Sequence, residues 1–286
     1  MLKDLLKDGK VIEREGIFVA REIAEKTVWD KLAIENPTHA VISAADEESA
    51  KIKSDLQIDR INQFVTEDTV LLDLGSGYGR VAKYLLPKQK LAGYIGVDSA
   101  YEMLALFRNR YQENQAEQST PALFVNADIH TLPLKDASVD MVIVCAVFLH
   151  NHKSVVEQSI EELKRVLKPG GTLLVYSSFP RGYTLMGLQG HMYQGLLNIL
   201  GKPLKNGPVR YYSKAELKKM LSGFSHITYV PDQFAILPKT LVFLPGILES
   251  VYRKLISVPV NKLLEKITPA FLKPQFAVFF DIIAKR

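Results

Sequence analysis

The stretch VLLDLGSGYGRVAKYLL, from Val70 to Leu86, combines an acidic residue with three closely spaced glycines. The glycines follow the spacing GxGxG, and Asp73 stands two residues before the first of them. Glycines let a backbone approach a ligand closely, and a helix that starts after them points amide groups at it. A carboxylate would repel a pyrophosphate here but attract an ammonium group. The stretch therefore favours a nucleoside with a cationic amino-acid tail over a dinucleotide, whose fingerprint is GxGxxG.

A second acidic residue, Asp98, ends the next apolar run, in YIGVDSAYEM. In nucleotide-binding sheets, an acid at the end of the second strand accepts hydrogen bonds from the ribose hydroxyls. Ser99 follows directly and would line the same pocket. Together with the glycine stretch, these residues predict a nucleoside site at the carboxyl ends of two neighbouring strands.

The elements that must position these residues alternate along residues 68–180. Strands are expected at TVLLDL, AGYIGVD, ALFVNAD, VDMVIVCAVFL and TLLVYSS, and helices at segments such as SAYEMLALFRNRYQ and SVVEQSIEELKRVL. Continuous Val, Ile and Leu runs are typical of strands that are buried on both faces. The alternation predicts an α/β fold in which helices cover both faces of a mostly parallel sheet.

The flanking segments carry looser patterns. We expect residues 1–65 to be mainly helical, because SDLQIDRINQF places its apolar residues near helical spacing. After residue 180, SKAELKKMLSGF predicts a helix whose start is a capping box of Ser213 and Glu216. HITYVPDQFAIL and PQFAVFFDIIAKR predict the last two strands.

The motif DLGSGYG resembles the first motif of the class I S-adenosylmethionine-dependent methyltransferases, and the order of elements over 68–180 is similar to theirs. The resemblance implies a Rossmann-like three-layer sandwich with a mostly parallel seven-stranded sheet, and an enzyme of the small-molecule type. It also implies S-adenosylmethionine as the methyl donor, S-adenosylhomocysteine as the product, and no metal.

The resemblance further implies a set of cofactor-binding residues. Asp128, in NADIHTLPL, would meet the adenine amino group, with the backbone of Ile129 beside it, and Met103 would pack on the adenine ring. Asp128 as a loop cap, Met103 as ordinary core and Cys145 as a small buried apolar residue remain alternatives. The full set is Asp73, Gly75, Ser76, Gly77, Gly79, Asp98, Ser99, Met103, Asp128, Ile129 and Cys145.

His150 is the candidate general base. It follows the fourth strand, close to the substrate cleft of an open sheet, and imidazole titrates near neutral pH. A base is needed only when the acceptor must lose a proton, so a histidine without catalytic role is the alternative. His152 is its neighbour. Further pocket candidates are Tyr78, Tyr211, Tyr212 and Trp29, the last in a helix that closes over the cofactor in the family.

The domain expectation is a helical N-terminal extension or cofactor cap over 1–65, followed by a methyltransferase domain over 66–286. Lid insertions are expected at about 181–212 and 238–273, where methionine, leucine and aromatic residues suit a small apolar or amphipathic acceptor. A lipid-like acceptor is a further hypothesis, because Lys and Arg are interspersed there. Whether oxygen, nitrogen or carbon is methylated stays open.

Charge is distributed unevenly along the 286 residues. Residues 181–286 carry 15 Lys and Arg against 5 Asp and Glu, whereas the whole chain carries 36 against 31. This basic, apolar last third allows a peripheral membrane contact, a nucleic acid, or only a solvated surface. A membrane-spanning helix is not expected near 240–260, because Glu249, Arg253 and Lys254 interrupt the apolar run.

The sequence also bears on localisation and leaves the function class open. A single cysteine and the charged start MLKDLLKDGK favour a cytoplasmic protein. A nucleic-acid-directed methyltransferase or a cofactor-fold module without catalysis would use the same motif, and an NAD-linked dehydrogenase fits its glycine spacing poorly. The oligomeric state has no signal in the sequence.

Overall fold

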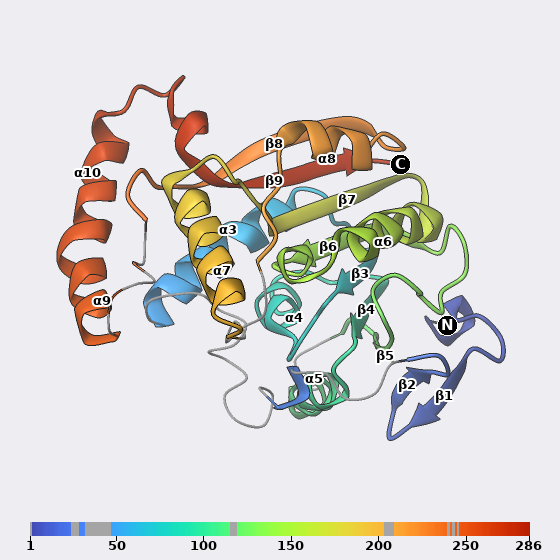
Figure 1. Cartoon of the computed structure of the whole chain (residues 1–286). Helices are drawn as coiled ribbons and strands as arrows, with labels where there is room; N and C mark the ends of the chain where they lie inside the picture. Colours follow the sequence, from blue (N-terminus) through green and yellow to red (C-terminus); the bar gives the residue numbers. More distant parts are fainter. Residues whose placement is uncertain are drawn as a thin grey trace.

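The computed structural model of the chain describes residues 2–23, 29–31, 47–114, 119–202, 209–238, 241, 244 and 246–286. These residues form one sheet of nine strands in the order β1-β2-β5-β4-β3-β6-β7-β9-β8, with helices on both faces (Figure 1). The strands are β1 (Val11–Arg14), β2 (Ile17–Ala20), β3 (Val70–Leu74), β4 (Gly93–Asp98), β5 (Ala122–Asn126), β6 (Val139–Cys145), β7 (Leu167–Pro180), β8 (Ser225–Phe234) and β9 (Ala277–Lys285).

The helices fall between these strands and at the chain's flanks. The α-helices are α3 (Glu47–Asn62), α4 (Arg80–Leu85), α5 (Tyr101–Glu113), α6 (Lys153–Val166), α7 (Leu185–Ile199), α8 (Lys214–Met220), α9 (Gly246–Tyr252) and α10 (Val258–Ile267). Shorter turns are η1 (Leu2–Leu5), η3 (Phe148–His150), the π-helical η4 (Arg253–Ser257) and η5 (Lys273–Phe276).

The central pairings confirm the predicted parallel sheet. β2, β5, β4, β3, β6 and β7 pair with one another in parallel, and β9 runs antiparallel between β7 and β8. The expected last two strands are β8 and β9, and the expected capping box starts α8. The carboxyl ends of the parallel strands therefore share one edge of the sheet, where ligands of such folds bind.

The N-terminal part corrects two expectations. Residues 11–20 form a β-hairpin and not helix, and β2 adds this hairpin to β5, so the described residues hold nine strands instead of seven. Its turn residues Glu15 and Gly16 both have positive φ, of 51° and 76°, as a tight hairpin turn requires. The helical segment predicted around 54–64 is confirmed as α3.

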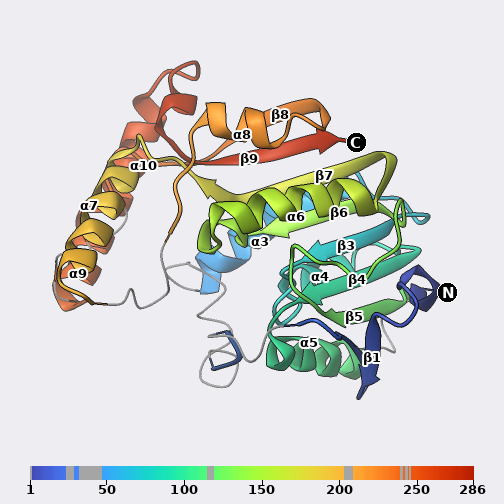
Figure 2. The same cartoon turned by 45° about the vertical axis from the view of Figure 1, so that its right-hand side comes forward.

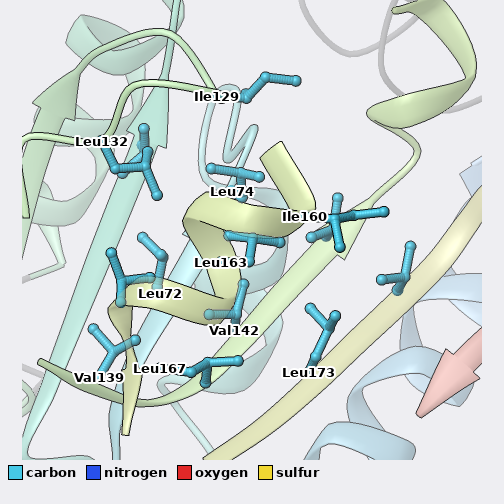
Figure 3. Packing of buried hydrophobic residues seen from close by; sticks show 14 of the residues in the cluster. Leu72, Leu74, Ile129, Leu132, Val139, Val142, Ile160, Leu163, Leu167 and Leu173 are labelled. Carbon is cyan, nitrogen blue, oxygen red and sulfur yellow. The ribbon is translucent and has the colours of Figure 1, made fainter. Parts of the chain in front are cut away.

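The sheet separates two apolar cores. Successive residues of a strand face opposite sides, so Leu72 and Leu74 pack under α6 while Leu71 packs toward α4 and α5. Figure 3 shows Leu72 and Leu74 close to Ile160 and Leu163 of α6. Burying each such side chain contributes about 2 kcal/mol, so these layers hold the carboxyl edge rigidly.

Both expected lid regions contain helices. α7 lies within 181–212, and α9, η4 and α10 lie within 238–273. Figure 2 shows these helices standing beyond the ends toward which the arrows of β3 and β7 point. None of the helices in the described part of the chain is long and apolar enough to span a membrane.

Candidate functional site

The glycine loop leaves β3 in a conformation that only glycine adopts easily. Gly75, Gly77 and Gly79 have φ angles of 71°, 53° and 81°, in the left-handed region. A Cβ on Gly75 would overlap the side chain of Val147, and one on Gly79 would overlap the ring of Phe107. The loop therefore packs against its neighbours so closely that a side chain at Gly75 or Gly79 would collide with them.

Backbone hydrogen bonds hold the start of this loop against the next strand. The amides of Gly75 and Ser76 both donate to the carbonyl of Val97, at 2.8 and 3.0 Å. Gly79 then caps α4, which begins at Arg80. Arg80 in turn donates to Ser54 Oγ and Gln57 Oε1 of α3, so the N-terminal helix is fastened beside the loop.

Asp98 joins the end of β4 to the glycine loop. Its Oδ2 accepts a hydrogen bond from the Gly77 amide at 2.8 Å, and its Oδ1 accepts one from the Ala100 amide at 2.9 Å. Burial raises the pKa of Asp98 to about 6, although both amide donors lower it. The carboxylate thus links the glycine loop to the end of β4, and its contact with a ribose stays a prediction.

Asp73 lies beneath the loop and not on its open side. Its side chain is 1% exposed, and Tyr94 Oη donates to its Oδ2 at 2.5 Å. Burial raises the pKa of Asp73 to about 7, against the lowering effect of the Tyr94 hydrogen bond. The attraction to an ammonium group stays a prediction. Sequence reasoning missed Tyr94, whose only signal is a hydroxyl in an otherwise apolar strand.

The Ser76 hydroxyl bears on whether the loop suits the predicted cofactor. The residue is 5% exposed, and its Oγ has no hydrogen-bond partner among the described residues. A buried polar atom without a partner is uncommon in folded proteins, and a bound ligand is one way to satisfy it. Together with Asp98, this hydroxyl fits a polar nucleoside and its amino-acid tail.

Asn126, at the end of β5, fixes the turn that carries Asp98 and Ser99. Its Nδ2 donates to the carbonyl oxygens of both residues, at 3.0 Å each. Sequence reasoning missed this role, because it depends on the pairing of Asp98 with Asn126 across two strands. Ser99 faces a cavity of about 370 Å³ that the hairpin helps to enclose, lined by Ile12, Arg14, Val19, Asp30, Ser99, Tyr101, Glu102 and Asn126.

Of three further predicted cofactor residues, Met103 and Ile129 lie in the core and Cys145 is only partly buried. Met103 is 2% exposed and packs with Tyr78 and Ala100, which agrees with the core alternative. Ile129 is buried in the α6-side core (Figure 3). Cys145 is half-buried and ends β6 opposite Tyr176.

Asp128 lies in the loop that follows β5. It is half-buried, and its carbonyl accepts a hydrogen bond from the Thr131 amide at 3.2 Å. This bond belongs to a tight turn, so the loop shape is fixed by backbone atoms. The contact of its carboxylate with an adenine stays a prediction.

His150 is half-buried at the end of η3, next to β6. Its ring packs edge-on against Trp29, with the ring centroids 5.5 Å apart. Burial lowers the pKa of His150, so the neutral imidazole prevails at pH 7. In the described part of the chain its Nδ1 has no hydrogen-bond partner. His152 differs, because its Nδ1 accepts from the Ser154 amide and caps α6.

The other aromatic candidates, Tyr212, Tyr211 and Tyr78, each contact neighbouring protein groups. Tyr212 is 2% exposed and donates from its hydroxyl to the Phe148 carbonyl, which makes it a structural residue. Tyr211 packs on His191 of α7 with centroids 4.4 Å apart, and Tyr78 is buried under the Arg110 guanidinium. The predicted helix around Trp29 lies mostly outside the described residues, which include only 29–31 there.

Comparisons with known proteins identify related domains and a related fold. The methyltransferase domain family matches residues 72–175. The chain is 33% identical to the demethylmenaquinone methyltransferase of Thermus thermophilus over 132 residues, covering 46% of this chain and 57% of that protein. It is 30% identical over 178 residues to a ubiquinone/menaquinone biosynthesis C-methyltransferase of Pseudomonas paraeruginosa, covering 56% and 66%. The chain spans about half the length of the first curated relatives it matches.

A solved structure supports the fold. A SAM-dependent methyltransferase from Methanosarcina mazei superposes with a TM-score of 0.51 at 18% identity, over 79% of this chain and 96% of that one. At this identity the likeness shows the fold alone, and the family match adds the domain's identity. Residues 72–175 therefore match a methyltransferase domain, and the fold is the Rossmann-like fold of S-adenosylmethionine-dependent methyltransferases.

Proposed function

We propose that the protein transfers a methyl group from S-adenosylmethionine to a small apolar or amphipathic acceptor, through the site formed by the glycine loop and Asp98. The observation that carries this proposal is the hydrogen bond from the Gly77 amide to Asp98, which brings the two motifs together at the carboxyl edge. The acceptor atom, oxygen, nitrogen or carbon, is left open.

In this proposal the chain's residues bind and position the reactants. When bound, the cofactor supplies an electrophilic methyl group on a sulfonium. Asp98 would hold the ribose, the Ser76 hydroxyl, which has no hydrogen-bond partner in the described structure, would hold the amino-acid tail, and Asp73 would attract its ammonium group. Fixing the methyl group in line with the acceptor supplies much of the rate of such a displacement.

His150 takes the acceptor's proton where there is one to remove. Burial favours the neutral ring, which is the form that can accept a proton. Its Nδ1 is buried and has no hydrogen-bond partner in the described structure. Two residues of the N-terminal segment contact this part of the molecule. Trp29 packs against the His150 ring, and Asp30 Oδ1 accepts a hydrogen bond from the Glu102 amide at 3.2 Å. These contacts support a cap role for the part of the segment at Trp29 and Asp30, whereas the hairpin at 11–20 belongs to the sheet.

The acceptor class rests on the lids and on the relatives. We assign the lid role to the helices within 181–212 and 238–273, whose outward side chains are largely apolar. Two curated relatives are named for quinone methylation, which supports a lipid-like small molecule. The proposed setting is the cytoplasm, at a membrane surface.

The test is a methylation assay with a methyl-labelled donor. The protein is incubated with lipid extracts, with purified quinones and with RNA, and each product is separated. Label in the organic phase, lost in Asp98→Ala, is expected. Label in RNA would instead show that the enzyme methylates nucleic acid. No label in any fraction, with the labelled donor still bound, would leave a binding module.

A further inference from the structure

The exposed apolar side chains of the molecule are concentrated in two places. Among the described residues, eighteen of the twenty large apolar side chains that are exposed lie in 183–200 or 244–272. Leu255 is 72% exposed, Leu263 59% and Ile267 66%. A monomeric soluble protein rarely exposes so many apolar groups together, and such a patch marks a contact with a partner or a membrane.

The helical arm α9–η4–α10 reverses the usual arrangement of polar and apolar groups. Asn261 is buried, and its Oδ1 accepts hydrogen bonds from the amides of Ile236 and Leu237, at 2.9 and 3.0 Å. Ser257 Oγ and Tyr252 Oη both donate to the carbonyl of Pro238. Polar side chains therefore fasten the arm to the protein.

The apolar residues of the same arm point the other way. Leu263 and Ile267 are four residues apart on α10, so they share one face, and both are exposed. If the arm served only to cover the site, its apolar face would point inward and its polar face outward. The opposite orientation indicates that another apolar phase receives this face.

Charge indicates which phase that is. Lys254, Lys262 and Lys266 are exposed beside these apolar residues, and none of the three forms an ion pair in the described structure. The arm contains fewer acidic residues, Glu249 and Glu265, than lysines. A helix with exposed leucine and isoleucine flanked by lysine is typical of the surface of an anionic bilayer.

The position of the arm suits delivery of an acceptor. Figures 1 and 2 both show α7, α9 and α10 on the same side of the molecule, and Figure 2 places them beyond the carboxyl ends of the strands. The glycine loop and Asp98 lie at that edge of the sheet. A membrane under these helices would face the side on which the site opens.

We propose that α9, η4 and α10, assisted by α7, dock the protein on the surface of an anionic lipid bilayer. Leu255, Leu263 and Ile267 enter the interfacial layer, and the three lysines contact lipid headgroups. The purpose of this contact, delivery of a membrane-dissolved acceptor, rests on the proposed function. The contact itself does not require the cofactor.

The test is co-sedimentation of the full chain with phosphatidylcholine vesicles, with and without phosphatidylglycerol. Lys262→Glu/Lys266→Glu should weaken binding to the anionic vesicles at least about tenfold. Leu263→Glu/Ile267→Glu should weaken it as much. The matched controls are Lys218→Glu/Lys219→Glu, on exposed lysines of α8, and Leu56→Glu, on an exposed leucine of α3, which should bind as wild type.

Three outcomes would overturn the docking. The first is wild-type protein that stays in the supernatant with both vesicle types. The second is arm and control variants that lose binding equally. The third is a concentration-dependent dimer that the Leu263→Glu/Ile267→Glu change dissociates, with no vesicle binding, because a second copy then covers the face. Binding of S-adenosylhomocysteine is measured separately, so its loss would contradict the proposed function and leave the docking standing.

Discussion

Replacing Gly75 by alanine should damage the loop far more than the size of a methyl group suggests. The residue has a φ of 71°, where an L-residue with a Cβ loses roughly 1–2 kcal/mol. The added Cβ would also overlap the side chain of Val147, and overpacking of this kind costs about 1–3 kcal/mol. The expected loss in unfolding free energy is therefore about 2–5 kcal/mol.

Gly170→Ala is the matched control. Gly170 has a φ of 77°, but a Cβ built there meets nothing within 4 Å. It should lose only the backbone part, about 1–2 kcal/mol. Adding Val147→Ala to Gly75→Ala should relieve the overlap and recover the unfolding free energy that overpacking removes. A double-mutant cycle isolates this recovery as a coupling energy of about 1–3 kcal/mol.

The assay is urea unfolding of wild type, Gly75→Ala, Val147→Ala, the double variant and Gly170→Ala at one pH, combined with calorimetric titration of S-adenosylhomocysteine. Gly75→Ala should lose cofactor affinity even at temperatures where it stays folded, whereas Gly170→Ala should keep it. The reasoning is refuted by a Gly75→Ala protein that is as stable as Gly170→Ala and binds the nucleoside normally. A coupling near zero with Val147→Ala would refute the packing part alone.

The remaining predictions concern the titrating groups. Asp73 keeps its proton up to about pH 7 in the folded chain but loses it near 3.8 when unfolded, so stability falls as pH rises through this window. Asp73→Asn should remove that fall, which changes its stability relative to wild type by about 3 kcal/mol between pH 5 and 8 in urea unfolding. Tyr94→Phe removes the donor to this carboxyl and should cost about 1–3 kcal/mol at pH 8 and less at pH 5. Burial lowers the pKa of His150, so the acid limb of its kcat profile should lie below the ordinary value of 6.5. His150→Ala should reduce turnover by about 10²–10⁴-fold with unchanged cofactor affinity if the ring is the base.

Each of these results has a clear opposite. A pH dependence of Asp73→Asn identical to wild type would show that the buried carboxyl does not titrate in the window. Equal costs for Tyr94→Phe at both pH values would point to packing and not to the charge. Retained turnover in His150→Ala would eliminate the histidine as the base.

The parts predicted well from sequence are those whose signals are local. The structure of the segment from β3 through the glycine loop into α4 can be predicted from sequence. A buried strand, a turn that requires positive φ and a helix follow one another directly there. The capping box at Ser213 is local too. The order of strands and helices over 68–180 then leads to the parallel sheet, since connections of this kind leave few other topologies.

The parts that sequence reasoning missed depend on contacts between distant segments. The β1–β2 hairpin lies in a segment expected to be helical, and only its pairing with β5 makes it part of the sheet. Tyr94 reaches Asp73, and Asn126 reaches Asp98, through strand registers that the chain order does not reveal. For the segment of α10 the sequence left a membrane contact and a solvated surface both open, because hydrophobic periodicity does not tell which phase receives an apolar face.

The central claim is that the glycine loop and Asp98 form a site for the methyl donor. Calorimetric titration of S-adenosylhomocysteine into wild type and Asp98→Ala tests it most directly. Wild type should bind one nucleoside per chain, and Asp98→Ala should bind about 100-fold more weakly, a loss of roughly 3 kcal/mol, while its unfolding midpoint shows that it is still folded. Folded wild type that binds no S-adenosylhomocysteine, or a folded Asp98→Ala with wild-type affinity, would contradict the claim.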